Sequence, residues 1–237
     1  MNIKGTLIFV MIVTATSIPL ALHILPNANS THPLVLKPLE KVKNAFQPLK
    51  AKNVSVEKIL KTKRCVGCDL QDIDLSGADL TGADFRNSDL TGANLKNSKL
   101  KDAKMAGVRL KDADLTNTDL DGADFIKSDL QGADLSGATL LNTSLVEADL
   151  TTATAKRTEF RDADLKGASL EKANLTGSFF TGAHLLEANL AGSNLTNANL
   201  RYANLRDADV TDVNFSGADL AFAILPNGTN PYGTTKY

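Results

Sequence analysis

Apolar residues recur at every fifth position of this chain from Leu70 to Leu225, without one break in phase. The recurrence spans 32 positions, most of them Leu, and the side chain two residues earlier is small in 28 of the 32 cases. The residue in between is Asp or Asn in 21 cases. A helix with 3.6 residues per turn would spread such leucines around all of its sides. The period therefore argues against a helical domain.

A short extended segment does satisfy the pattern. In Ala78-Asp79-Leu80, for example, Ala and Leu point to one face and Asp points to the other. The next two residues must turn the chain, and Gly, Asn or Asp fills the second of them in 24 of 32 cases. These residue types tolerate the positive φ of tight turns. Each pentad thus predicts one short side and one corner, and stacked coils of pentads bury Leu and Ala inside.

The segment SGADLTGADF, residues 76–85, resembles the pentapeptide-repeat family, and matching pentads cover about residues 66–225. The resemblance implies an all-β fold, a right-handed quadrilateral parallel β-helix with four pentads per coil. Eight coils at a spacing of about 4.8 Å would make a rod roughly 38 Å tall. Bulky residues 20 apart support this period, because Phe85, Met105 and Phe125 would share one column and Phe160 and Phe180 another.

The remaining chain divides into three segments by composition. Residues 1–30 have the plan of a secretory signal peptide, with Lys4 before an apolar run and a small-x-small site at 28–30. An uncleaved membrane anchor is the alternative. We therefore predict a signal peptide or anchor at 1–30, a linker and capping helix at 31–64, the β-helix at 65–225 and a tail at 226–237.

Both ends of an open stack expose backbone donors and acceptors. Residues 53–64 predict a short helix that caps the first coil through Val56, Ile59 and Leu60. Residues 38–46 predict a second, less regular helix or tether. The tail either folds over the last coil or leaves it available to a partner, so an end-to-end or C-terminal dimer is one expected association.

Two cysteines, Cys65 and Cys68, stand where the repeats begin. An oxidising, exported compartment permits a disulfide between them. Two inert buried thiols and a regulatory redox pair are the alternatives. A thioredoxin-like role lacks its βαβ context, and zinc or haem attachment lacks further ligands in the sequence.

Charge divides the chain into a basic start and an acidic repeat region. Residues 66–225 carry 25 acidic residues against 15 Lys and Arg, a net charge of −10. Duplex DNA carries one charge per about 1.7 Å, so a rod of this height would need roughly 22 negative charges to imitate it. We therefore do not expect mimicry of DNA to be the main function of this protein. We also expect no nucleic-acid partner. The third predicted coil carries a basic belt: Lys96, Lys99, Lys101, Lys104, Arg109 and Lys111.

Column neighbours of this belt alternate in sign, as in Asp79–Lys99–Asp119, which stabilises a sheet without any ligand. The belt and the outward or corner residues Phe179, Tyr202 and Phe222 are the candidate contact surface for a protein partner. Isolated large apolar side chains in water are a clue to an interface.

No motif for catalysis, phosphate binding or metal binding appears in the sequence, and His184 has no nucleophile tied to it. We predict no enzyme activity and no cofactor. The predicted function is an exported scaffold that presents β-helix faces to a protein. The resemblance to exported cyanobacterial and thylakoid-lumen members implies a lumenal or periplasmic location, with membrane contact only through residues 1–30. The alternative, implied by other members, is a DNA-mimic inhibitor of a topoisomerase-type enzyme.

Overall fold

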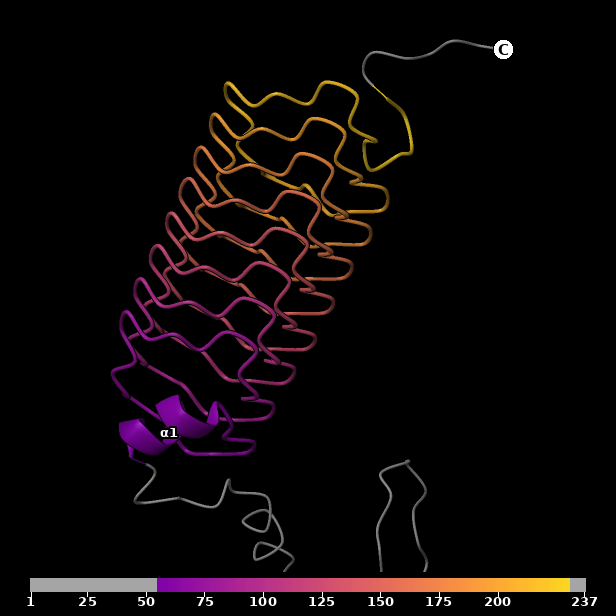
Figure 1. Cartoon of the computed structure of the whole chain (residues 1–237). Coiled ribbons are helices and arrows are strands. Elements are labelled where there is room, and N and C mark those ends of the chain that lie inside the picture. The colour runs from indigo at the N-terminus through magenta and orange to yellow at the C-terminus, as the bar shows by residue number, and fades with distance from the viewer. Residues whose placement is uncertain (1–54, 231–237) are drawn as a thin grey trace, which may run out of the picture. The chain divides into compact units, whose positions relative to one another are not determined.

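The computed structural model describes residues 55–230 and shows a stack of similar coils with one short helix at its base (Figure 1). Each outward side position pairs in parallel with the position 20 residues later, from Arg64–Asp84 to Asn204–Ile224. The pentads thus wind with the 20-residue period that the sequence predicts. The predictions for residues 1–30 and 38–46 lie outside the described residues.

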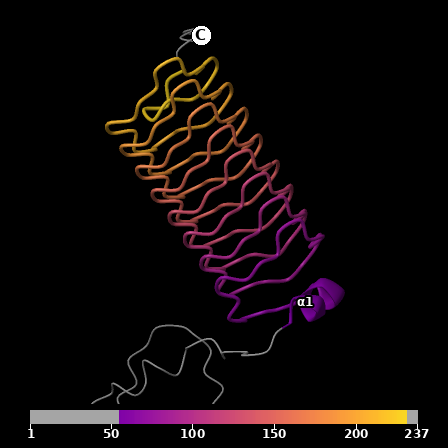
Figure 2. The same cartoon turned by 90° about the vertical axis from the view of Figure 1, so that its left-hand side faces the viewer.

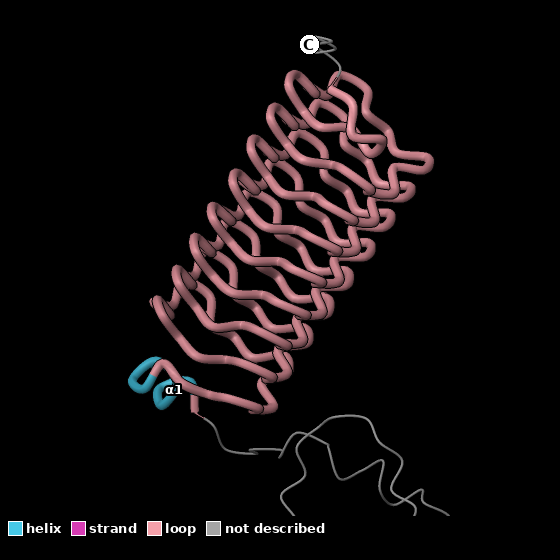
Figure 3. Tube along the Cα trace, turned by 90° about the vertical axis from the view of Figure 1, so that its right-hand side faces the viewer, coloured by secondary structure: helices cyan, strands magenta, loops and turns pink. Residues whose placement is uncertain are grey.

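The sides of each coil are hydrogen-bonded to the coils above and below. Leu90 N donates to Arg109 O at 2.7 Å, and Asp89 N donates to Cys68 O at 2.8 Å. Each side contributes a single bridged residue rather than a longer strand, so residues 55–230 appear as loops apart from one helix (Figure 3). Hydrogen bonds between stacked coils therefore satisfy the backbone N–H and C=O groups, although no long strands form.

The four sides and edges are named here by the residues that they carry. Sides A, B, C and D have their outward residues at 64, 69, 74 and 79 and at every twentieth position thereafter. Edge CD contains the corner residues 76–77 and their equivalents, and edge DA contains 81–82 and their equivalents. Edges AB and BC are defined in the same way, from 66–67 and 71–72.

Corners are tight turns with one backbone conformation. The second corner residue has a positive φ throughout, for example +67° at Gly77 and +58° at Asn87. The next amide commonly closes the turn, as where Ala93 N donates to Leu90 O at 3.0 Å. A positive φ at only the third residue of such a turn is the type II pattern, which explains the preference for Gly, Asn and Asp.

The inward residues form one continuous core along the stack. Leu and Phe at every fifth position are fully buried in the middle coils, and the rings of Phe160 and Phe180 stack with centroids 4.7 Å apart. Inward hydroxyls are buried as well, and Thr118 Oγ1 donates to Leu95 O in the coil below at 2.9 Å. Four more inward hydroxyls, those of Ser88, Ser128, Thr143 and Thr158, donate in the same way to a carbonyl of the coil below. The buried hydroxyls of Ser98 and Ser193 have no hydrogen-bond partner among residues 55–230.

The helix α1 spans Val56–Thr62 and lies at the lower end of the stack (Figure 2). Ser55 caps it by accepting a hydrogen bond from Lys58 N, and Lys63 ends it in the left-handed conformation. Ile59 is fully buried in the core, whereas Val56 and Leu60 are exposed. The prediction that all three pack on the first coil is wrong for Val56 and Leu60, because this short helix buries only one position.

Candidate interaction surface

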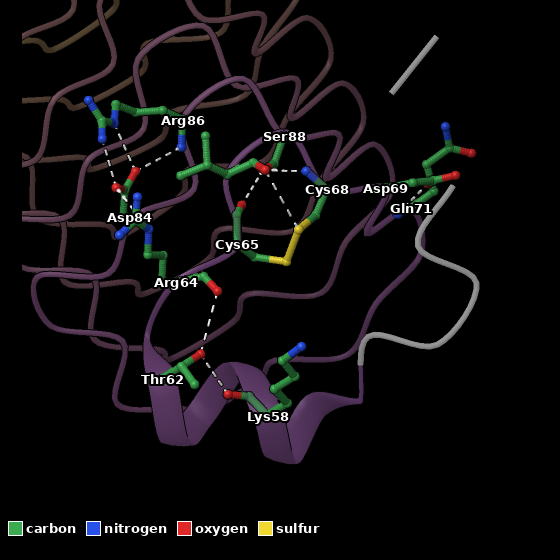
Figure 4. The surroundings of a disulfide bond; sticks show 11 residues. Lys58, Thr62, Arg64, Cys65, Cys68, Asp69, Gln71, Asp84, Arg86 and Ser88 are labelled. Carbon is green, nitrogen blue, oxygen red and sulfur yellow. Dashed lines mark hydrogen bonds and ion pairs between the residues drawn. A yellow bond between two sulfur atoms is a disulfide. The ribbon is translucent and has the colours of Figure 1, made fainter. Parts of the chain in front are cut away.

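The first corner of the stack is closed by a disulfide between Cys65 and Cys68, with Cα atoms 5.5 Å apart (Figure 4). Ser88 in the coil above places its hydroxyl between the two residues. Its Oγ accepts from Cys68 N at 3.1 Å and donates to Cys65 O. At most other corners the equivalent backbone N–H and C=O groups hydrogen-bond to each other directly. Here the Ser88 hydroxyl bridges them, so this corner is held by the disulfide and by the Ser88 side chain.

Three carboxylates near the base of the stack have strongly lowered pKa values. The pKa of Asp79 is about 2 because Thr81 N and the Lys63 ammonium hydrogen-bond to it. The bidentate Arg86 guanidinium lowers the pKa of Asp84 to about 2.

The third carboxylate, Asp89, is 5% exposed. Burial acts to raise its pKa, but hydrogen bonds from Arg109, Thr91 and Gln71 outweigh burial and lower the pKa to about 2. These groups are structural carboxylates that remain ionised at neutral pH.

The basic belt circles the rod rather than forming one patch. Lys99 lies on side D, Lys104 on side A and Arg109 on side B, and the remaining three occupy edges CD, DA and BC. The predicted alternation of charge along the columns is present, since Lys99 is bridged to Asp79 below and Asp119 above. A flat partner on one side would therefore meet only part of the belt.

Direct ion pairs engage two of the six belt residues. Lys101 Nζ lies 2.7 Å from Asp121 Oδ2, and an Arg109 guanidinium nitrogen lies 2.8 Å from Asp89 Oδ2. Within residues 55–230, the other four make no ion pair shorter than 4 Å. The belt balances acidic neighbours, and its geometry does not mark a binding face.

The three candidate aromatic residues, in contrast, gather on one part of the surface. Phe179 lies on side D, and Tyr202 and Phe222 follow on edge DA of the coils above. Their exposed fractions are 37%, 57% and 45% respectively. The Tyr202 and Phe222 rings stack with centroids 5.0 Å apart and planes 8° from parallel. We call Phe179, Tyr202 and Phe222 the aromatic cluster.

Arg201 joins this cluster, which sequence reasoning missed. Its guanidinium carbon lies 5.7 Å from the Tyr202 ring centroid and 5.5 Å from that of Phe222. One of its nitrogens also lies 3.2 Å from Asp219 Oδ2 on side D. The signal in the sequence is the 20-residue spacing of Tyr202 and Phe222, which predicts ring stacking, with a cation adjacent to the first ring.

Tyr202 and Phe222 occupy corner positions that suit glycine. Their φ values are +59° and +63°, a region that bulky residues seldom adopt. Such residues persist where the surrounding structure holds them and are enriched at functional sites. The coil stack holds both backbones here while leaving both rings in solvent.

A second feature is a shallow hollow on edge CD, with a volume of about 320 Å³. Lys96 and Arg157 line it together with Thr116, Ser136 and Gly137. The Thr116 hydroxyl is buried without a hydrogen-bond partner. The hollow holds hydroxyls and cations but no nucleophile paired with a base.

Residues 55–230 contain no group of three or more His, Cys, Asp or Glu side chains arranged to hold a metal ion. In the same residues, no helix has the length and apolar character needed to cross a membrane. His184 is exposed on side A.

Comparison with known proteins gives a consistent family. The pattern described as pentapeptide repeats matches in eight copies, over residues 68–105, 103–140, 143–182 and 180–217. No curated protein matches the chain.

Several solved structures are similar. HetL, a pentapeptide repeat protein involved in heterocyst differentiation regulation from the cyanobacterium Nostoc sp. strain PCC 7120, is 30% identical, with a TM-score of 0.50 over 75% of this chain and 100% of its own. A pentapeptide repeat protein from the Arabidopsis thaliana thylakoid lumen is 35% identical over 48% of this chain and 70% of its own, with a TM-score of 0.21. QnrB1, a plasmid-mediated fluoroquinolone resistance protein, is 26% identical over 66% of this chain and 82% of its own, with a TM-score of 0.32. The repeat match covers more than half of the sequence and agrees with the coil geometry, so this chain belongs to the pentapeptide-repeat family and is a right-handed β-helix solenoid.

Proposed function

We propose that this protein is a non-enzymatic scaffold, a rod of about eight coils that presents its outer surface to a protein partner. The observation that carries the proposal is the aromatic cluster, Phe179, Tyr202 and Phe222, which is exposed on one part of the rod, whereas Val66 and Ile126 are exposed singly on another edge. Grouped exposed apolar side chains mark interaction sites more often than scattered ones. The related HetL is involved in regulation of differentiation, a role consistent with binding rather than catalysis.

The proposal includes export. Residues 1–30 have the layout of a signal peptide, and their removal would release the rod into a thylakoid lumen or periplasm. If these residues stay attached, they would instead anchor the rod to a membrane. A disulfide between Cys65 and Cys68 is consistent with an oxidising compartment.

The C-terminal end is a second proposed contact, for a second copy of the chain. Val210, Phe215 and Leu220 belong to the last coil and are only partly buried, unlike the equivalent residues of lower coils. End-to-end docking would cover this apolar surface and extend the core across two molecules. Sedimentation velocity over a concentration series tests this contact, and a purely monomeric rod at high concentration would exclude it.

A DNA-mimic inhibitor of a topoisomerase-type enzyme is the second candidate function, favoured by the net charge of −10 over residues 66–225. That charge is less than half of what duplex DNA of this length would carry. The basic belt also interrupts the acidic surface on sides A, B and D. We therefore place the DNA-mimic function second. Supercoiling inhibition by the purified rod, together with a cytosolic mature form, would reverse this order.

Affinity capture from native membrane and soluble fractions tests the scaffold function. The informative bait is the double variant Tyr202→Asn and Phe222→Asn, because Asn tolerates the positive φ of these corners. The matched control is Ile126→Ser, which removes an exposed apolar side chain from another edge. We expect a captured protein that is lost with the double variant and kept with the control. Equal capture by all three baits would contradict the proposal, and cell fractionation reports the location.

A further inference from the structure

Along one column of edge DA, the type of side chain changes from acidic to aromatic within four coils. The second corner residues there are Asp162, Gly182, Tyr202 and Phe222, each directly above the last at 20-residue intervals. Tyr202 and Phe222 fill their levels with stacked rings. The Gly182 level has no side chain, so it separates an exposed ring above from a carboxylate below.

The carboxylate of Asp162 faces this level. Its Oδ1 lies against Gly182, and its Cγ lies 3.5 Å from the point where a Cβ on Gly182 would stand. Asp162 makes no side-chain hydrogen bond or ion pair with any other residue between 55 and 230, whereas the nearby Glu159 is paired with Arg161 at 2.7 Å. An oxygen of this unpaired carboxylate thus occupies the place that a side chain on Gly182 would take.

The flanking positions are also suited to a ligand. Phe179 on side D and His184 on side A belong to the same coil as Gly182, three residues before and two residues after it. Both side chains are exposed or nearly so. Bound cations in proteins are commonly surrounded by aromatic rings and carboxylates. This place has an aromatic ring above it, a second one beside it and a carboxylate below.

The dimensions fit a flat cation. The Asp162 carboxylate reaches the coil of Gly182, which lies one coil spacing of about 4.8 Å below Tyr202. A planar group that lies under the Tyr202 ring can therefore meet this carboxylate with its edge. A guanidinium is planar, stacks on aromatic faces and pairs with carboxylates through two parallel hydrogen bonds. An ammonium lacks that plane.

The protein already contains this interaction in the coil above. The Arg201 guanidinium lies 5.7 Å and 5.5 Å from the Tyr202 and Phe222 ring centroids and pairs with Asp219 at the same time. An arginine next to Gly182 would combine the same two kinds of contact, with the Tyr202 ring and the Asp162 carboxylate.

We propose that the Gly182 level accepts an arginine side chain from a basic segment of the partner protein, stacked on Tyr202 and paired with Asp162. This proposal rests on the scaffold function and names the chemistry of its partner. The net charge of −10 on residues 66–225 would draw a basic segment toward the rod. The aromatic cluster would then select arginine among the basic residues.

The same edge provides an internal control. Asp102 lies under Gly122 as Asp162 lies under Gly182, with its Cγ 3.6 Å from the corresponding Cβ point. The residue above Gly122 is Asn142 rather than an aromatic residue. The two places therefore match in backbone, glycine and carboxylate, and they differ in the ring and in the belt residues Lys101 and Lys104 next to Asp102.

Calorimetric titration with an acetylated hexa-arginine peptide tests the proposal on the full mature chain. We expect saturable binding that weakens about threefold to tenfold in each of Asp162→Asn and Tyr202→Asn. Asp102→Asn should bind like the unaltered chain, and acetylated hexalysine should bind more weakly than hexa-arginine. Asn is compatible with the corner φ in all three variants, and matching circular dichroism and melting curves would verify their folding.

The proposal is overturned if hexa-arginine shows no saturable binding. It is also overturned if Asp102→Asn weakens binding as much as Asp162→Asn does, or if hexalysine binds equally well, since either result indicates only the general field of an acidic rod. Capture of the native partner separates this failure from failure of the scaffold function. A partner that is lost with Tyr202→Asn and Phe222→Asn but retained by Asp162→Asn would keep the scaffold and exclude the arginine contact.

Discussion

Inward residues of the same three columns are buried to different extents at the two ends of the rod. At the N-terminal end, Leu70, Leu75 and Leu80 are almost completely buried, at 3%, 2% and 0% exposure. In the last coil the equivalent residues Val210, Phe215 and Leu220 are only partly buried. Identical positions in a repeat thus acquire different environments from what lies beyond them.

The N-terminal end is closed by several independent devices. Ile59 of α1 enters the core, the disulfide closes the first corner, and Asp89 is locked by three neighbouring side chains. Among the described residues, the last coil receives a smaller closure, in which Leu225 N donates to Thr229 O at 2.7 Å. The comparison teaches that the repeat alone does not finish a β-helix and that an end is either sealed by added residues or left able to associate.

The strongest test of this difference is a pair of truncations in one column. We expect Leu75→Ala to lower the free energy of unfolding by about 3 kcal/mol, because it empties a fully enclosed site. Phe215→Ala should cost less, about 1–2 kcal/mol, although its ring is larger, because water already reaches it. Urea denaturation of both variants measures the pair. A larger loss for Phe215→Ala would show that the last coil is sealed as well as the first.

Removing the helix contact should make the two ends more alike. Ile59→Ala is expected to cost about 2–3 kcal/mol, since Ile59 is fully buried. Leu60→Ala is the matched control on the same helix and should change stability by less than about 0.5 kcal/mol, because this side chain is exposed. Thermal melts followed by circular dichroism compare the two. Equal effects would mean that α1 packs differently from this description.

Reduction of the disulfide should weaken the N-terminal end specifically. The bond between Cys65 and Cys68 closes a very short loop, for which the chain-entropy relation gives about 2 kcal/mol of stabilisation. Denaturation with and without a reductant measures the loss. A Cys65→Ala and Cys68→Ala variant should not respond to the reductant, and a response from it would assign the effect elsewhere.

Acid should also destabilise the N-terminal end more than the last coil. The pKa of Asp89 is about 2 in the folded state, below the ordinary value of 3.8. A carboxylate with a lowered pKa stabilises the fold at pH values above its unfolded pKa, and this contribution is lost as the pH falls from about 4 toward 2. We expect Asp89→Asn to cost roughly 1–2 kcal/mol at pH 6 and to flatten the acid limb of the stability curve.

Asp209 on the same side of the last coil is exposed and provides the control. Asp209→Asn should have a much smaller effect at pH 6. Stability curves from pH 6 to pH 2 for both variants measure the difference, and coincident curves would refute an N-terminal origin of the acid sensitivity.

Most of the fold follows from the spacing of residues in the sequence. The inward positions of Leu80 and Ala83 and the positive φ of Gly82 are each implied by the pentad pattern. Contacts between long side chains do not follow from it in the same way. Arg201 contacts the Phe222 ring and pairs with Asp219, which are 21 and 18 residues away, and the pattern specifies only that these positions face outward.

The candidate surface was only partly predictable for the same reason. The exposed positions of Tyr202 and Phe222 follow from their corner register, but the role of Ser88 at the disulfide and the exposure of Val56 and Leu60 do not. A hydroxyl between two backbone groups depends on local opening of the corner. Which side of a two-turn helix is buried depends on the shape of the first coil, and the sequence of the helix does not specify that shape.

The distance between two spin labels on side C tests the 20-residue coil most directly. Asn94 and Asn214 are joined by six successive bridges, so labelled Asn94→Cys and Asn214→Cys positions should lie about 29 Å apart, with a narrow distribution. Electron–electron double resonance on the oxidised protein, in which Cys65 and Cys68 remain bonded, gives this distance. A distance near 38 Å, as a coil of 15 residues would give, or a broad distribution would contradict the stacked four-sided rod.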